Sequence, residues 1–304
     1  QLFVTGNSLE MATAGTIVEV TLRLVMILFS ILWNLFIVRV YFLEYRINKA
    51  LQPTELIVTL LALFNVCLPV CLVIPVLRLN FFCRYFGEEV VKLIEVVIIF
   101  ISKSSYWFTA WLCFFYCMKI VKFNWRFLLR LKQKISSMVK GLIVFTLMFC
   151  FSLSVPIISI IKLKTNSSYT PKECQSIFGR GKSTIIYGVI FTVFTSLLPL
   201  AIMVVSSLTI VIFLCRHSRN LTKNVSTNGS SHSDAHTAVA IMLVCLIVLY
   251  IACTSTVMAA NLQASLGNID LFVGISVSSY LYSGGSAVLL VIGTVKLRQS
   301  FKKL

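Results

Sequence analysis

Three residues near the middle of the chain combine one positive charge with two large aromatic rings. Lys103, Trp107 and Trp111 follow one another at intervals of four residues, a spacing that places them on one face of a helix. An ammonium group attracts anions and carbonyl oxygens, and an indole offers a rigid apolar surface for stacking. The pattern favours a binding site for a small organic molecule. It leaves open the alternative that the tryptophans only pack between helices while the lysine extends toward lipid headgroups.

Catalytic and metal-binding patterns are weak throughout the sequence. The three histidines, His217, His232 and His236, share one loop with a single acid and no cysteine at ligand spacing, so we predict no metal site. The run GRGKST at 179–184 lacks the glycine that a phosphate-binding loop needs, because that position is Ser176. We therefore predict neither an enzyme nor a bound cofactor.

The composition indicates an integral membrane protein. Hydrophobic residues make up 58% of the chain and charged residues only 12%, which a water-soluble domain of this size could not bury. The net charge of +17 would suit a nucleic-acid partner, but the basic residues fall between long apolar runs instead of covering one face. This arrangement is a topology signal, and we predict no nucleic-acid binding.

Seven apolar runs are long enough to cross a hydrocarbon core. We predict an all-α bundle of seven transmembrane helices at 15–43, 53–79, 89–117, 140–162, 184–215, 238–264 and 270–293. Segment 1–14 precedes the bundle, and we expect the first span to remain as an anchor and not to be cleaved as a signal peptide. In the tail 294–304, Leu297, Phe301 and Leu304 share a face surrounded by basic residues. This pattern predicts a short interfacial helix on anionic lipid.

The distribution of Lys and Arg indicates which side faces the cytoplasm. Of the 27 basic residues, 17 fall on the side that holds the C-terminus and 8 on the side that holds the N-terminus. Segment 118–140 has no acid and carries seven of them: Lys119, Lys122, Arg126, Arg130, Lys132, Lys134 and Lys140. We therefore predict a multi-pass protein of the cell membrane with its N-terminus outside and its C-terminus in the cytoplasm.

Glycosylation sequons and cysteines mark the outer loops. Three sequons in loop 216–237, at Asn220, Asn224 and Asn228, argue for the opposite orientation. We attribute them to the Ser, Thr and Asn content of that loop and predict that Asn166, in outer loop 163–183, carries the glycan. Eight of the ten cysteines lie in or beside the spans. The other two, Cys83 and Cys174, lie in outer loops, and whether they form a disulfide is left open.

The end of the third span carries the most specific signal. Trp107 and Leu112 are followed by Phe115-Tyr116, Lys119-Ile120 and Phe123, and this run resembles the W-x-A-T-x-L-x-x-F-Y-x-x-K-I-x-x-F signature of the type 2 (bitter) taste receptors. Five other spans contain segments similar to that family: Asn34-Leu-Phe-Ile, Leu60-Leu-Ala-Leu, Leu198-Pro-Leu with His217, Asp234-Ala-His leading to Leu249-Tyr250, and Lys296-Leu-Arg-Gln. The chain is thus identified as a divergent member of a family of seven-helix G-protein-coupled receptors.

Several positions depart from the family pattern. Asn65 stands where the family usually has an arginine, and the Y-P-S-x-H-S run of the seventh span reads Tyr282-Ser-Gly-Gly-Ser-Ala. Ile241 replaces a lysine in the sixth span, and Thr294 replaces the asparagine before Lys296. These departures concern contacts between helices and leave the expected fold unchanged.

The resemblance implies that small-molecule agonists enter from outside among the third, fifth, sixth and seventh spans. The cytoplasmic ends would then open to a heterotrimeric G protein, taste-type or Gi-like. Besides Lys103, Trp107 and Trp111, the candidate ligand-facing residues are Phe191, Phe194, Thr195, Tyr250, Thr254, Val257, Ser276, Ser279 and Tyr280. The candidates for the G-protein side are Lys119, Lys122, His217, His236 and Lys296. Membrane lipids are the other expected partner, and formation of a homo-oligomer is left open.

Two other functions remain open from the sequence. A type 1 vomeronasal receptor would share the bundle but differ in the signatures of the third and sixth spans. A seven-span transporter or channel would contain internal repeats or paired broken helices with charged residues at mid-membrane. The sequence contains no repeat and few such charges, so the receptor interpretation is preferred.

Overall fold

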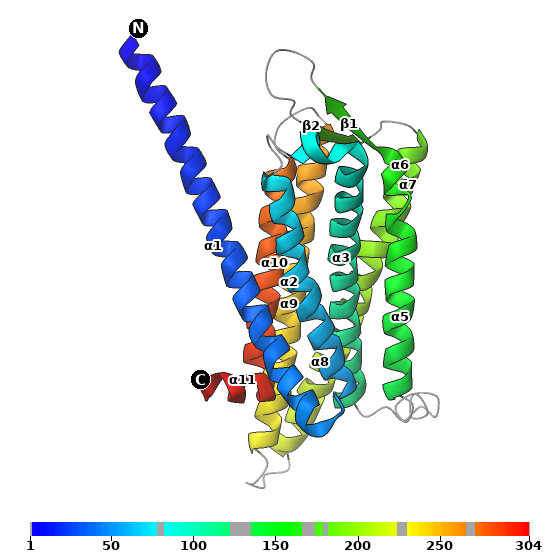
Figure 1. The fold of residues 1–304 in the computed structure, drawn as a ribbon. Coiled ribbons are helices and arrows are strands. Elements are labelled where there is room, and N and C mark those ends of the chain that lie inside the picture. Colours follow the sequence, from blue (N-terminus) through cyan, green and yellow to red (C-terminus); the bar gives the residue numbers. More distant parts are fainter. Residues whose placement is uncertain are drawn as a thin grey trace.

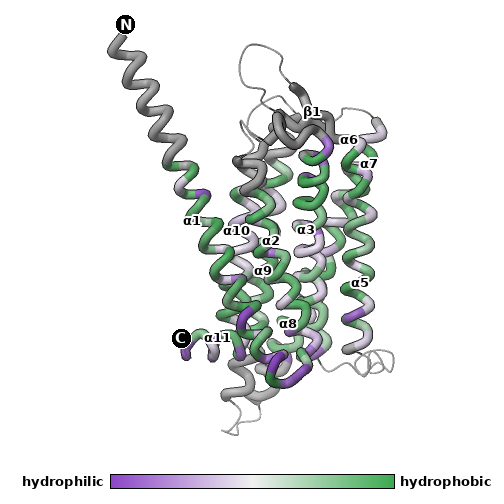
Figure 2. The backbone as a smooth tube through the Cα atoms, viewed as in Figure 1, coloured by the Kyte–Doolittle hydropathy of each residue, from purple (hydrophilic) through white to green (hydrophobic). Residues whose placement is uncertain are grey.

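The predicted bundle of seven membrane-spanning helices is confirmed. The computed structural model describes residues 2–77, 82–121, 135–165, 174–178, 182–223, 230–265 and 271–303. Within these residues, seven helical stretches are long and apolar enough to cross a membrane: Val20–Asn48, Pro53–Leu72, Lys92–Ile120, Ser137–Ile160, Ser183–Arg216, Thr237–Ala259 and Ser276–Gly293. They run side by side, with α1 leaning away from the others, and hydrophobic residues line their length (Figures 1 and 2).

The first three spans are α1 (Leu2–Asn48), α2 (Pro53–Leu77) and α3 (Phe82–Ile120). At the end of α1, Lys49 adopts a positive φ of 54°, the left-handed conformation that commonly terminates a helix. Helix α2 then starts at Pro53, which needs no amide partner in a first turn. The carboxylate of Glu55 accepts a hydrogen bond from the backbone N–H of Gln52 at 2.8 Å, so a capping interaction fixes the start of α2.

The fourth and fifth spans are interrupted helices. Pro156 separates α5 (Ile135–Ser154) from the short α6 (Ile157–Ile160), since proline has no N–H to continue the helical bonds. The fifth span consists of α7 (Lys182–Thr192), a π-helical segment (Val193–Leu197) and α8 (Leu198–Lys223). Helices α9 (Ser230–Ser265) and α10 (Leu271–Gly293) form the sixth and seventh spans, and α11 (Val295–Lys302) follows.

A short hairpin is added to the helical fold. Strands β1 (Ile161–Thr165) and β2 (Cys174–Phe178) pair antiparallel, with Ile161 opposite Phe178 and Thr165 opposite Cys174. The purely helical prediction missed this hairpin, although Ile161-Lys-Leu-Lys-Thr alternates as a strand does. Asn166 lies outside the described residues, as do the side chains of Cys83 and Cys174, so the glycan and the disulfide stay predictions.

Buried polar side chains connect three of the spans. The Asn34 amide donates to the carbonyl oxygens of Ser30 at 2.8 Å and Ser283 at 3.2 Å, so α1 is bonded to α10. The Ser283 hydroxyl donates to the carbonyl oxygen of Asn65 at 2.8 Å, and the Asn65 amide donates to the Ser286 hydroxyl at 3.2 Å. All five residues are fully buried. These bonds fix α1, α2 and α10 against one another where no water is available.

Helices α9 and α10 approach closely beside Gly293. A Cβ atom placed on Gly293 would lie 2.3 Å from the sulfur and 2.5 Å from the Cβ of Met242 on α9, distances that real Cβ atoms do not show. Only glycine therefore fits at the end of α10 without displacing α9.

Helix α11 lies across the end of the bundle at which α1 ends and α2 begins (Figure 1). Its Leu297 is fully buried. The ring of Phe301 stacks on Trp33 of α1 at 5.3 Å between centroids and meets Phe36 edge-on at 5.8 Å. One face of the predicted interfacial helix is thus occupied by the protein's own α1.

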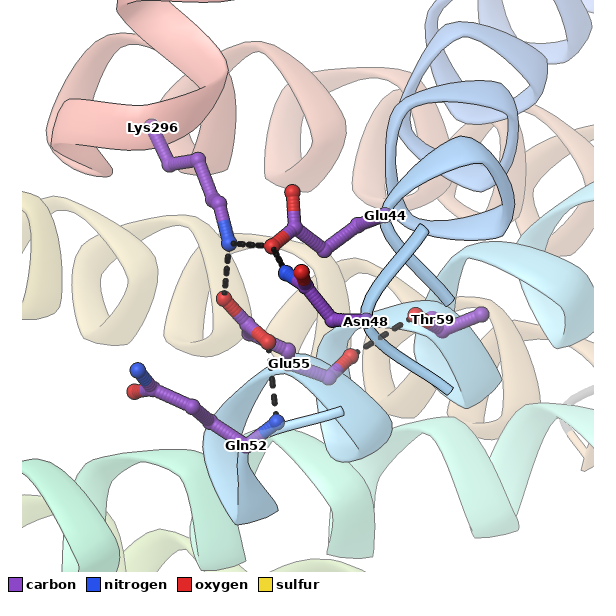
Figure 3. A network of polar contacts seen from close by, with 6 residues as sticks. All are labelled: Glu44, Asn48, Gln52, Glu55, Thr59 and Lys296. Atoms are coloured by element: carbon purple, nitrogen blue, oxygen red, sulfur yellow. Dashed lines mark hydrogen bonds and ion pairs between the residues drawn. The ribbon is translucent and has the colours of Figure 1, made fainter. Parts of the chain in front are cut away.

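An ionic cluster also attaches α11 (Figure 3). The ammonium nitrogen of Lys296 lies 2.9 Å from the Glu44 carboxylate of α1 and 2.8 Å from the Glu55 carboxylate of α2. Asn48 donates a hydrogen bond to the same Glu44 oxygen. Burial by itself lowers the pKa of Lys296, but the hydrogen bonds to Glu55 and Glu44 outweigh it, so the net pKa is raised above its ordinary value.

Glu55 should contribute more than Glu44 to the attachment of α11. Its side chain is 10% exposed against 23% for Glu44, and it also caps α2. We expect Glu55→Gln to lower the free energy of unfolding of the protein in detergent by about 1 kcal/mol, and Glu44→Gln by less. The measurement is the thermal unfolding temperature of each variant. Because a glutamine keeps an oxygen that can cap α2, equal losses would show that the deeper burial of Glu55 adds nothing.

The contribution of Lys296 to stability should have a defined dependence on pH. A group whose pKa is raised by folding stabilises the folded state fully below its ordinary pKa, here 10.5, and loses that contribution only as the pH rises through the folded value. The stability lost in Lys296→Met should therefore be the same at about pH 6 and about pH 9. A loss that shrinks between these conditions would contradict the pairing.

Candidate functional site

Lys103 lies inside the bundle on α3, partly buried. Its ammonium group donates a hydrogen bond to the hydroxyl of Ser196 at 3.1 Å. The same nitrogen lies 5.2 Å from the ring centroid of Tyr106 and 5.6 Å from that of Phe191, distances at which an aromatic ring attracts a cation. The predicted cation therefore sits between α3 and the fifth span, with aromatic rings beside it.

The π-helical segment of the fifth span brings Ser196 to Lys103. The backbone N–H of Leu198 bonds to the carbonyl of Val193, five residues back. Pro199 favours this wider turn, because its ring would clash with the carbonyl four residues earlier in a regular helix. Thr195 and Ser196 are both buried as a result, and such π-helical turns occur frequently at functional sites.

Three tyrosines form the centre of the cluster. The ring of Tyr106 on α3 meets Tyr250 of α9 at 4.8 Å and Tyr282 of α10 at 5.0 Å, both edge-on. The Tyr250 hydroxyl donates to the carbonyl oxygen of Ser196 at 2.7 Å. Since the Thr109 hydroxyl donates to the carbonyl of Ser105 at 3.0 Å, the Tyr282 hydroxyl donates to Thr109, at 2.7 Å. Four spans therefore meet at this cluster.

The two tryptophans have different surroundings. Their rings lie 5.4 Å apart, and Trp107 also meets Phe149 of α5 edge-on at 6.0 Å. The Trp111 indole N–H donates to the hydroxyl of Thr146 on α5 at 2.9 Å. The Trp107 indole N–H is buried and has no hydrogen-bond partner among the described residues. Trp111 is thus fixed to α5, whereas the polar atom of Trp107 has no such bond among the described residues.

The other predicted ligand-facing residues have different surroundings, and only Phe191 has a described contact with Lys103. Phe191 lies beside Lys103, Thr195 is buried and bonds to the Phe191 carbonyl, and Thr254 bonds to the Tyr250 carbonyl. Phe194 is 42% exposed and contacts Phe149. Val257 and Ser279 are partly buried, and Ser276 is fully buried.

Tyr280 lies elsewhere in the bundle. It packs in a separate hydrophobic cluster with residues of α1, α2 and α3: Ile27, Leu68, Leu72, Ile98 and Ile101. The seventh span instead directs Tyr282 to the site, two residues further along α10. The structure therefore does not bring Tyr280 together with Lys103.

Tyr106, Ser196 and Tyr282 were not among the predicted site residues. Tyr106 lies three residues after Lys103, a spacing that also places it on the same side of the helix. Pro199 is the sequence signal for the altered turn that buries Ser196. Tyr282 begins the departing Tyr-Ser-Gly-Gly run of the seventh span. Each signal was present, but none specified a contact between helices.

The residues predicted for the G-protein side are only partly described. Lys119 is exposed at the end of α3, whereas Lys122 lies outside the described residues. His217 and His236 belong to α8 and α9, but their side chains are not described. Lys296 is held by Glu44 and Glu55. Whether these residues meet a G protein stays a prediction.

Comparison with known proteins identifies a family of membrane receptors. The model of the taste receptor protein (TAS2R) family matches residues 11–304. Taste receptor type 2 member 40 of Gallus gallus is 29% identical over 184 residues, which cover 59% of this chain and 59% of that relative. Taste receptor type 2 member 9 of Homo sapiens is 25% identical over 283 residues, 89% of this chain and 88% of the relative.

A third relative extends the match to nearly the whole chain. Taste receptor type 2 member 1 of Pan paniscus is 22% identical over 307 residues, which cover 96% of this chain and 97% of that protein. Neither the vomeronasal nor the transporter alternative is favoured by these matches. Together with the seven membrane-spanning helices, they establish that this multi-pass membrane chain belongs to the taste receptor protein (TAS2R) family, whose members are chemosensory G-protein-coupled receptors.

Proposed function

We propose that this chain is a bitter taste receptor that binds small, mostly apolar molecules at the cluster around Lys103, Trp107 and Tyr250. The observation that carries this proposal is the meeting of four spans at one cation and its surrounding rings. Aromatic rings suit chemically varied apolar ligands, and the few polar groups among them orient the ligand.

The same contacts link ligand binding to the arrangement of the helices. Ser196 touches Lys103 of α3 through its hydroxyl and Tyr250 of α9 through its carbonyl. A ligand that displaces either contact changes how the fifth and sixth spans pack on α3. Such a ligand favours one of two arrangements of the bundle, and a G protein that binds the same arrangement is activated.

We place the N-terminus outside and the end that holds α11 in the cytoplasm. The basic residues concentrate at that end, where α3 finishes at Ile120 and exposes Lys119. On this orientation the ligand enters from the hairpin side, and a heterotrimeric G protein, taste-type or Gi-like, binds at the opposite side. Anionic lipid would contact the exposed Arg298, Lys302 and Lys303 of the α11 end.

Trp107→Ala should abolish the agonist response or shift it strongly without removing the receptor from the cell surface. Trp107 offers both its ring and an indole N–H without a partner among the described residues, whereas Trp111 is bonded to Thr146. Trp111→Ala should therefore reduce surface expression as well as response. The assay is a calcium measurement in cells that carry a taste-type G protein, with antibody staining of the surface. Unchanged potency of several unrelated agonists in Trp107→Ala would place the binding site elsewhere.

The orientation predicts a single glycan, on Asn166. Glycosidase treatment should shift the mass of the receptor by one glycan, and Asn166→Gln should remove that shift. Gln substitution at Asn220, Asn224 or Asn228 provides the matched controls and should have no effect. A glycan on any of these three would invert the proposed orientation.

Charge reversal at the end of α3 should separate coupling from binding. Lys119→Glu combined with Lys122→Glu should weaken G-protein activation, because loop 118–140 is proposed to meet the G protein and anionic lipid. Ligand binding should stay nearly intact, since Lys119, in the last turn of α3, lies about four helical turns beyond Lys103. Lost binding at normal surface expression would refute this division.

A further inference from the structure

The ammonium group of Lys103 has no carboxylate partner within the described part of the chain. Its polar contact there is the neutral hydroxyl of Ser196. Lys296, by contrast, lies within 3 Å of both Glu44 and Glu55. A cation near the middle of a membrane span costs about 2.5–3.5 kcal/mol on insertion scales. A neutral hydroxyl and two aromatic rings offset only part of this cost, so Lys103 retains an unmet preference for a negative charge.

A second polar group on the same helix face is also unsatisfied. Trp107 follows Lys103 by one helical turn, is 4% exposed, and its indole N–H has no hydrogen-bond partner among the described residues. Leaving a buried donor unpaired costs about 1–3 kcal/mol. Trp111 shows that the bundle can satisfy an indole, because its N–H reaches Thr146.

The two groups face adjoining spans. Lys103 contacts Phe191 and Ser196 of the fifth span. Trp107 contacts Phe149 of α5, which in turn meets Phe194 of the fifth span at 6.0 Å. The ammonium group and the indole N–H are therefore two donors, one turn apart, on the side of α3 that faces the fourth and fifth spans.

We propose that Lys103 and Trp107 form a subsite for the carboxylate or sulfonate group of an aromatic agonist. The agonist brings the negative charge that the protein lacks at this point and accepts hydrogen bonds from both donors. Its ring then lies against the side chains of Phe191 and Trp107. This inference rests on the proposed function and narrows it, because it makes organic anions a preferred class of agonist.

Ser196 has a distinct place in this subsite. Its hydroxyl accepts the hydrogen bond of Lys103, so it competes with an incoming anion for the ammonium group. Removing that hydroxyl should leave the affinity for anions intact or raise it. Removing either donor should lower it. These opposite changes in the affinity for anions distinguish an anion subsite from a general need for intact packing.

The test compares aromatic acids with their uncharged methyl esters. In cells carrying wild-type receptor and a taste-type G protein, the acid should be more potent than its ester. Lys103→Gln should reduce the potency of the acid by about tenfold to a hundredfold, which corresponds to a charge-assisted hydrogen bond, and should leave the ester within about threefold. Trp107→Phe keeps an aromatic ring and removes the N–H. It should therefore reduce the potency of the acid several-fold and leave the potency of the ester unchanged. Ser196→Ala should not reduce the potency of the acid.

Direct binding keeps the test independent of signalling. Purified wild-type receptor in detergent should unfold at a higher temperature with an aromatic acid than with its ester, and Lys103→Gln should abolish that difference. An acid that stabilises wild type no more than its ester overturns the subsite, as does a preference that survives in Lys103→Gln. If the subsite fails while neutral agonists still activate the wild type, the proposed receptor function stands. If the acid stabilises wild type more than its ester and Lys103→Gln removes that difference, yet neither compound produces a G-protein response, the proposed function fails and the subsite stands.

Discussion

No water reaches the hydrocarbon core of a bilayer, so a polar side chain inside this bundle can be satisfied only by another part of the protein. Most of the buried polar groups obey this constraint through bonds between distant spans. Asn34 and Ser283 bond α1 to α10, Tyr282 and Thr109 bond α10 to α3, and Tyr250 bonds α9 to the Ser196 carbonyl. Apolar packing against lipid-like surroundings discriminates little between helix arrangements, and these bonds therefore specify which helices are neighbours.

Lys103 and Trp107 are exceptions to this constraint, because each lacks the partner that a comparable residue has. The two lysines with the clearest environments differ: Lys296 is paired with two carboxylates, whereas Lys103 is met by a hydroxyl and aromatic rings. Of two neighbouring tryptophans, Trp111 has a hydrogen bond from its indole N–H, and Trp107 has none among the described residues. Buried polar atoms without a partner also occur elsewhere among the described residues, for example at Ser207 and Tyr280, but at Lys103 and Trp107 a cation and an indole N–H on one helix face both lack an anionic or accepting partner. The proposed binding site therefore rests on what Lys103 and Trp107 lack as well as on the rings around them.

The sequence predicted the membrane spans well because apolar runs report directly on the bilayer, and the spacing of Lys103, Trp107 and Trp111 placed one helix face. It predicted contacts between helices poorly. The extra residue of the π-helical segment changes the register after Val193, so Phe194 is 42% exposed while Ser196 is buried. Counting at 3.6 residues per turn cannot anticipate that change, although Pro199 indicates it. In the seventh span, Tyr280 was expected at the site and packs against α1, α2 and α3, while Tyr282 takes its place.

The departures from the family pattern in α2 and α10 are connected by hydrogen bonds. With Asn65 where an arginine is usual, α2 carries a neutral amide that bonds to Ser286, and the Ser283 hydroxyl bonds to the Asn65 carbonyl. Ser283 stands where the family pattern has a proline, and α10 continues unbroken from Leu271 to Gly293. A proline there would disrupt the helical bonds of α10, and an arginine in α2 would need a counter-charge that Ser283 and Ser286 do not supply. The substitutions in α2 and α10 therefore fit each other, and they exchange an interaction that would involve charge for a neutral network of hydrogen bonds.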